Sequence, residues 1–168
     1  LLDFVYERVT GYLREQGYSA QEADAVMAVR PMWGTIPQAL DAVRSFAALP
    51  ESAALAAANK RIGNILKKAE SEAPVAVEVN EALLQEKAEQ DLHVAMQKTL
   101  PEADARFDAG DYTASLQTLA ALRAPVDAFF DGVMVNAEDA TVRNNRLGLL
   151  KTLHQAMNRV ADLSRLAV

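Results

Sequence analysis

The sequence predicts an all-α protein, a helical bundle, and three observations support this fold class. Hydrophobic residues make up 51% of the 168-residue chain, and the most frequent of them is alanine, which is the best helix former. Val, Ile, Thr and aromatic residues rarely cluster as strands require. Apolar side chains recur at helical spacing along most of the chain. The length suits one domain of ordinary size, or one domain with a helical annex.

The first two helices are marked by their ends. Residues 2–16 place apolar side chains on one helical face, and Gly17 is suited to end that helix in the left-handed conformation. Ser19 and Glu22, three residues apart, match a capping box that starts the second helix. That helix is expected to stop before Pro31, because the residue before a proline is disfavoured in a helix.

A third helix is predicted over residues 37–48, with a proline in its first turn. Pro50 then breaks the chain again. We therefore expect a boundary here, between an N-terminal helical annex (1–49) and the main domain (50–168).

In the main domain the pattern predicts helices over 51–69, 84–105 and 112–122, a short helix from Pro125, and a final helix from about 140 to 166. After the first of these, residues 70–91 carry seven acids against one lysine. Their first part, "ESEAPVAVEVNEA", is typical of a loop, and we expect an exposed excursion there.

Helix 51–69 is sharply divided between an apolar and a basic face. Its apolar side chains fall within an arc of about 100°, and its polar ones lie roughly opposite. The polar arc holds Lys60, Arg61, Asn64, Lys67 and Lys68. A solvated helix face usually mixes charges of both signs to gain i,i+4 pairs, and this face holds no carboxylate. Anion binding and plain solvation both remain open for it.

No catalytic or metal-binding motif is present. The chain has no phosphate-binding glycine loop, no HExxH sequence and no credible Ser/His/Asp set. The absence of cysteine excludes disulfides and cysteine-based metal sites, and His93 and His154 are too far apart in sequence for a metal spacing. We expect no catalytic centre and no metal, and His93 and His154 to be solvated or satisfied helix histidines.

Composition also limits the partners and the setting. No run of about 18 apolar residues exists, so we expect no membrane partner. The net charge of −6 alone argues against nucleic acid, but the distribution of charge matters more than its sum. The chain starts without a methionine, inside a helical pattern, and we expect an excised piece of a larger cytoplasmic protein.

The final helix opens with "RNNR", residues 143–146, and helical geometry divides these four. Arg143 points away from the apolar stripe, whereas Arg146 lies between Val142 and Leu150 on the apolar side. A charge on that side requires a partner. Asp131, in the preceding helix, is the nearest plausible one, so we predict a structural ion pair between Arg146 and Asp131.

"FFDGVMVNAEDATVRNNRLGLLKTL" (129–153) resembles the signature of the DALR anticodon-binding domain, an all-α domain of arginyl- and cysteinyl-type tRNA synthetases and of the bacterial glycyl-tRNA synthetase β subunit. "LAAANKRIGNILKK" and "FDAGDYTASLQTLAALRAPVDAFFDGVMV" fit that β subunit best, and "LLDFVYERVTGYLREQGYSAQEADAVMAV" is similar to the helical region before the domain. The namesake Asp-Ala-Leu-Arg is not intact, because Thr141-Val142-Arg143 follows Asp139-Ala140. Val142 can take the inward role of the leucine.

The resemblance implies a parent glycine–tRNA ligase built from α and β subunits. Its α subunit activates glycine with ATP and Mg²⁺, its β subunit binds tRNA, and this domain approaches the anticodon. The expected partners are therefore tRNA(Gly) and the α subunit, with no DNA. No cofactor is expected in this fragment.

If the chain is an anticodon-binding domain, two patches are candidates for RNA contact. Lys60, Arg61, Lys67 and Lys68 would meet phosphates, and Asn64 a base edge. Arg143, Asn144 and Asn145 would act at a helix N-terminus, which favours anions. The sequence does not show whether the patches are adjacent. The alternative is a helical interaction domain that docks on a partner subunit without touching RNA.

Overall fold

The computed structural model describes residues 1–167, which form helices joined by turns and loops and contain no strand. The all-α prediction is confirmed. The α-helices are α1 (Leu2–Glu15), α2 (Ala20–Ala28), α3 (Ile36–Ala47), α4 (Ser52–Glu70), α5 (Lys87–Asp108), α6 (Tyr112–Leu119), α7 (Arg123–Gly132) and α8 (Ala140–Met157). Short 3-10 helices are η1 (Trp33–Thr35), η2 (Glu81–Leu83), η3 (Ala120–Leu122) and η4 (Leu163–Leu166). Among these residues no helix combines the length and apolarity needed to cross a membrane.

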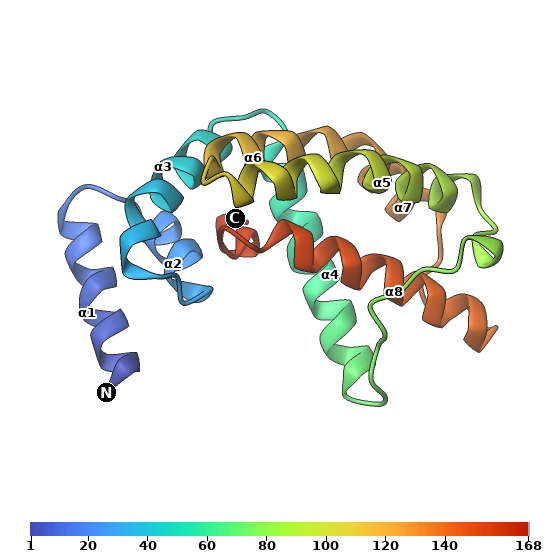
Figure 1. The fold of residues 1–168 in the computed structure, drawn as a ribbon. Coiled ribbons are helices and arrows are strands. Elements are labelled where there is room, and N and C mark those ends of the chain that lie inside the picture. Colours follow the sequence, from blue (N-terminus) through green and yellow to red (C-terminus); the bar gives the residue numbers. More distant parts are fainter. Residues whose placement is uncertain (168) are drawn as a thin grey trace.

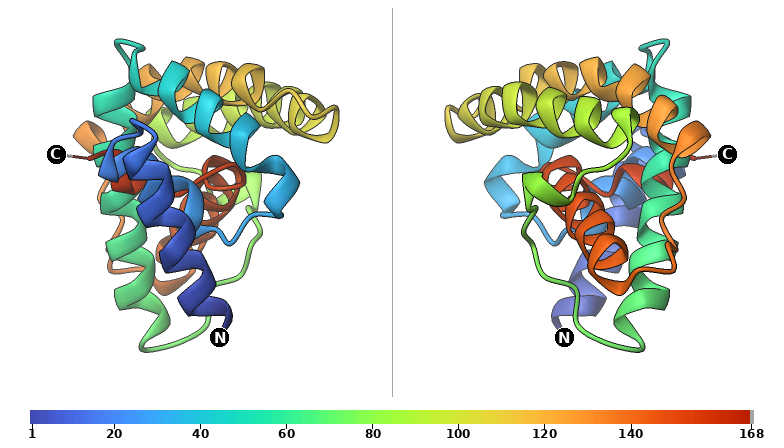
Figure 2. Two further views of the ribbon diagram at one scale, coloured as in Figure 1. Left: turned by 90° about the vertical axis from the view of Figure 1, so that its left-hand side faces the viewer. Right: turned by 90° about the vertical axis from the view of Figure 1, so that its right-hand side faces the viewer.

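The helices are arranged in two tiers with a cluster at one end. Figure 1 shows α5, α6 and α7 along the top, with α4 and α8 crossing below them. Helices α1, α2 and α3 gather at one end, where α3 packs on α6. The chain returns after α8, so that η4 packs against both α4 and α2, and Figure 2 shows this return from two sides.

The core lies between the two tiers. Its largest side chains are less than 2% exposed and come from helices α3 to α8: Phe46, Leu55, Ile62, Leu92, Leu116, Phe129, Leu149, Leu150 and Leu153 are among them. The apolar face predicted for residues 51–69 is buried in α4, and the stripe predicted for the last helix is buried in α8. Burial of these stripes fixes the rotation of both helices, and so determines which side chains face solvent.

Sequence signals for helix ends are confirmed where they were most specific. Gly17 has a φ of 97°, the left-handed conformation expected after α1. Ser19 accepts from the Glu22 backbone N–H, and the Glu22 carboxylate accepts from Ser19 N–H, which completes the capping box of α2. Asp111 likewise caps α6 by accepting from Ala114 N–H at 3.0 Å.

The last helix ends earlier than predicted, at Met157 rather than near residue 166. Asn158 accounts for the difference, because its Nδ2 donates to His154 O at 2.7 Å and its Oδ1 accepts from Leu163 N–H at 3.1 Å. The side chain thereby replaces main-chain helix bonds. Asp162 N–H then donates to Ala25 O at 2.8 Å, which holds the returning chain on α2.

The acidic segment 71–86 is attached to α8. Most of its side chains are exposed, as expected, but its backbone is held by Lys151 Nζ, which donates to Val75 O at 2.9 Å. Gly148 allows a close approach, since a Cβ there would lie 2.2 Å from Glu78 O. Helix α5 starts at Lys87 instead of residue 84, where Glu86 and Glu89 form a capping box.

The predicted boundary at residues 49/50 stays a prediction. Packing of α3 on α6 and of α2 on η4 crosses that boundary.

Candidate functional site

The exposed face of α4 carries a group of cations. Lys60, Arg61, Asn64, Lys67 and Lys68 are all exposed, as the helical period predicts. Within residues 1–167, every ion pair that forms uses cations elsewhere in the chain. The four positive charges of α4 are thus not neutralised by neighbouring carboxylates, which leaves them available to an anion.

Arg61 is positioned by an aromatic side chain. Its guanidinium lies over the ring of Phe130, on α7, with 4.3 Å between the guanidinium carbon and the ring centroid. Phe130 is only partly buried, and Arg61 is exposed. The contact limits the freedom of the arginine and leaves its donors on the surface.

A groove runs along the other edge of this face, between α4 and the returning C-terminal segment. We call it the α4–η4 groove. Its volume is about 780 Å³, and it is lined by Lys60, Asn64 and Lys67 from α4, by His154 from α8, and by Asp162 and Arg165 from the C-terminal segment. Three of the five predicted residues of α4 therefore share one hollow.

His154 is a groove residue that the sequence interpretation set aside as a solvated or satisfied histidine. It is half-buried, and burial lowers its pKa, against opposing contributions from Asp162 and Glu70. Its imidazole is therefore neutral at pH 7, with one donor and one acceptor nitrogen. The Cβ that Gly63 lacks would lie 3.4 Å from Nε2 of this ring.

The floor of the groove is a pair of amides. Asn59 Nδ2 donates to Asn158 Oδ1 at 2.7 Å, and Asn158 Nδ2 donates to Asn59 Oδ1 at 2.9 Å. Asn59 is 0% exposed, so the reciprocal bonds satisfy a fully buried side chain. This pair fixes the distance between α4 and the end of α8, and with it the width of the groove.

The second predicted patch, at the start of α8, is mostly occupied by structural contacts. Arg143 is half-buried, and its Nη1 donates to Ala137 O at 2.9 Å. The helix N-terminus is already capped by Asp139, whose carboxylate accepts from Thr141 N–H and Val142 N–H. Only Asn144 is exposed, and it lines a different hollow, beside segment 71–86.

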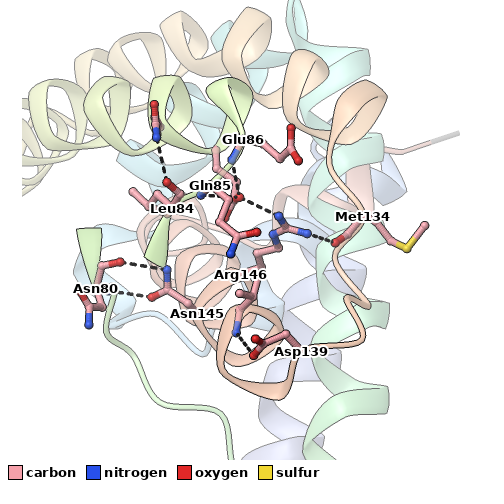
Figure 3. A network of polar contacts seen from close by, with 11 residues as sticks. Asn80, Leu84, Gln85, Glu86, Met134, Asp139, Asn145 and Arg146 are labelled. Carbon is pink, nitrogen blue, oxygen red and sulfur yellow. Dashed lines mark hydrogen bonds and ion pairs between the residues drawn. The ribbon is translucent and has the colours of Figure 1, made fainter. Parts of the chain in front are cut away.

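Asn145, named from the sequence as a candidate RNA contact at the start of the last helix, is buried. Asn145 is 7% exposed and forms two bonds with the backbone of Asn80: its Oδ1 accepts from Asn80 N–H at 2.7 Å, and its Nδ2 donates to Asn80 O at 3.1 Å. Figure 3 shows this pairing. Segment 71–86 covers a side of α8 that the apolar period of the α8 sequence predicts to be exposed.

Arg146 is buried as predicted, but its partner is Glu89 instead of Asp131. Arg146 Nη2 lies 2.9 Å from Glu89 Oε1. Its Nη1 donates to Met134 O at 2.6 Å, and Figure 3 shows this contact. Asp131 is exposed. The prediction failed because α5 packs on α8 and places its first turn over the guanidinium. Glu89 itself lies in the buried stripe of α5, three and seven residues before Leu92 and Met96, and that signal was available in the sequence.

The sequence of the chain is similar to the sequences of known proteins. The family model described as the DALR anticodon binding domain matches residues 55–163. Glycine–tRNA ligase beta subunits from Acidovorax sp. (strain JS42), Polaromonas naphthalenivorans (strain CJ2) and Methylobacillus flagellatus are 67%, 68% and 61% identical, over 100%, 99% and 98% of this chain. The chain spans 23% of the length of each of these relatives.

Proposed function

Because the chain belongs to the DALR anticodon-binding domain family, we propose that it binds the anticodon region of tRNA(Gly) as part of a glycine–tRNA ligase beta subunit. Activation of glycine, with its ATP and Mg²⁺, is assigned to the α subunit of the parent enzyme. The chain itself contributes RNA recognition and no reaction step.

The cation group on α4 carries this proposal. Lys60, Arg61, Lys67 and Lys68 are exposed on one helix without a carboxylate partner in the described residues, in a chain whose net charge is −6. Concentrating unpaired cations on one face of an acidic chain costs local i,i+4 stabilisation. Phosphates compensate this repulsion, and RNA binding needs such a positive face.

The start of α8 contributes fewer candidate contacts than its sequence predicts. Asn144 remains a candidate contact, and Arg143 retains those donors that its own turn does not use. Asn145 is withdrawn from the proposed interface because it is buried under segment 71–86.

A titration of the chain with a tRNA(Gly) transcript at 50 and 200 mM salt tests the function. If α4 neutralises about four phosphates, the slope of log K against log salt is about −3, and the affinity falls roughly 60-fold over this range. A tRNA of the same fold with a changed anticodon is the control. Equal binding of both RNAs would contradict anticodon recognition, and salt-independent binding would contradict phosphate contact.

A second candidate is docking on a partner subunit, such as the α subunit, without RNA contact. It is favoured by large apolar side chains exposed on α1 and on the turn after α2: Leu2, Phe4, Tyr12, Met32 and Trp33. Tyr6 stacks on Trp33 with 4.6 Å between ring centroids, which gives this surface a rigid centre. If this is the main role, the chain binds purified α subunit with little salt dependence and binds tRNA negligibly.

A further inference from the structure

The polar side chains of the α4–η4 groove are of two kinds: some form hydrogen bonds or ion pairs within the chain, and the others, the open groups, form none. Asn59 and Asn158 bond each other, and Asp162 accepts from Ser164 and pairs with Arg165 at 3.3 Å. No intramolecular side-chain bond involves Lys60, Asn64 or Lys67 among residues 1–167. These three residues form the open part of the α4 wall, and the ring of His154 on α8 likewise has no hydrogen bond or ion pair among residues 1–167.

The spacing of the open groups suits a single nucleotide. Lys60 and Lys67 are two turns apart, or about 10 Å along the axis, and Asn64 lies between them on the same face. Two cations thus bracket one amide, which can donate and accept along a base edge. Paired with phosphate contacts on either side, this is the arrangement that splayed bases of single-stranded RNA require.

The opposite wall supplies a ring. His154 is half-buried and lies beside Gly63 of α4, where an added Cβ would stand 3.4 Å from Nε2. Its imidazole can stack on an unpaired base or hydrogen-bond to it, as aromatic side chains do in RNA-binding proteins. The groove volume of about 780 Å³ falls within the range of small-molecule sites, about 300–1,000 Å³.

We propose that the α4–η4 groove holds one unstacked nucleotide of the bound RNA, with Lys60 and Lys67 on its flanking phosphates, Asn64 on its base edge and His154 against its ring. The proposal rests on the tRNA binding proposed above and assigns His154 to the interface. Lys68 and Arg61, on the other edge of α4, contact the backbone outside the groove.

Single substitutions, made in the whole chain, test the α4 wall and the α8 wall of the groove separately. His154→Ala is expected to weaken binding of a tRNA(Gly) transcript by about fivefold or more, with the salt slope unchanged, because a stacking contact carries no counterion. Lys60→Gln and Lys67→Gln are expected to weaken binding and to reduce the magnitude of the slope by about one each. Lys98→Gln, an exposed lysine on α5 outside the groove, is the matched control and should change neither quantity.

A measurement on the unaltered chain removes dependence on the folding of variants. The chain has two histidines, so its histidine ring-proton NMR signals fall into two sets, and comparison with His154→Gln assigns them. Adding a hairpin with the tRNA(Gly) anticodon stem and loop is expected to shift the His154 signal and to leave that of His93, on α5, in place.

The outcomes separate this proposal from the function on which it rests. If the unaltered chain binds tRNA with a steep salt dependence, but His154→Ala binds equally well and its NMR signal does not move, the groove proposal is overturned and RNA binding stands. If the groove instead accepts a protein, these variants leave tRNA affinity unchanged and weaken binding of the α subunit. Absence of tRNA binding by the unaltered chain overturns both proposals.

Discussion

Glu89 and Arg146 form the only ion pair of the described residues in which both side chains are nearly fully buried, 0% and 6% exposed. Glu89 Oε1 also accepts from the backbone N–H groups of Gln85 and Glu86. One carboxylate oxygen thus joins the first turn of α5 to α8, while Met134 O binds the same guanidinium from the α7–α8 connection. The pair positions three segments.

Removing the guanidinium is expected to destabilise the fold. Arg146→Ala leaves the Glu89 carboxylate buried without its cation, which costs about 3–5 kcal/mol. For a chain of this size the melting temperature should fall by roughly 6–20 °C in a thermal denaturation. Asp131→Ala, at the exposed carboxylate, should stay within about 0.5 kcal/mol of the unaltered chain. A variant at Arg146 that loses tRNA affinity and keeps its melting temperature would show a binding role instead.

At the scale of elements, segment 71–86 depends on a glycine of α8. Gly148→Ala would gain about 1 kcal/mol of helix propensity, but its Cβ would meet backbone oxygens of Glu78 and Ala76 at 2.2 and 3.1 Å. Backbone cannot rotate away, so the segment must lift. We expect a net loss of about 1 kcal/mol or more and faster amide exchange across residues 74–84.

The matched control for Gly148 is Gly11, in α1. A Cβ at Gly11 would meet nothing within 4 Å, so Gly11→Ala should stabilise the chain by up to about 1 kcal/mol. Unchanged exchange in segment 71–86 of Gly148→Ala would mean that the segment is not held by α8.

The elements also show where sequence reasoning stops. Capping residues and apolar periodicity predict α1, α2 and α4 closely, and the period alone placed Arg146 on the buried side. The period of α5 likewise places Glu89 on a buried side, but it does not pair Glu89 with Arg146, because the two lie 57 positions apart and their contact depends on how α5 packs on α8. Asn145 was wrongly predicted to be exposed for a related reason. Segment 71–86 buries it, and the apolar period of α8 does not predict that this segment packs there.

The groove illustrates the same limit. Its α4 wall follows from helical period, so Lys60, Asn64 and Lys67 were predicted to share a face. Its other wall requires α8 to stop at Met157 and the chain to return along α4. Asn158 causes that stop through side-chain bonds to His154, Leu163 and Asn59, and these partners come together only in the folded chain.

At the scale of the whole molecule, charge is distributed unevenly. Eight cations of the described residues lack an ion pair, and four of them lie on α4: Lys60, Arg61, Lys67 and Lys68 (the others are Arg8, Arg14, Lys98 and Arg143). An acidic chain that binds RNA must cluster its positive charges on one part of its surface, because its net negative charge repels phosphate.

Two charge reversals that change the net charge equally test whether the position of a charge or the net charge of the chain controls tRNA binding. Lys68→Glu and Lys98→Glu each change the net charge from −6 to −8, since one positive charge is replaced by one negative charge. Both lysines are exposed, on α4 and α5 respectively, so neither change should disturb the core. Lys68→Glu loses a phosphate contact and adds local repulsion, and we expect about a tenfold loss of tRNA affinity at 50 mM salt.

Lys98→Glu should stay within about twofold, because Lys98 lies on α5, outside the proposed α4 interface, and salt screens its charge. The gap between the two variants should narrow as salt rises to 200 mM, since local repulsion is screened and fewer counterions are released. Parallel titrations by fluorescence anisotropy measure both. Equal losses in the two variants would show that net charge controls association, and the α4 face would then have no special place in binding.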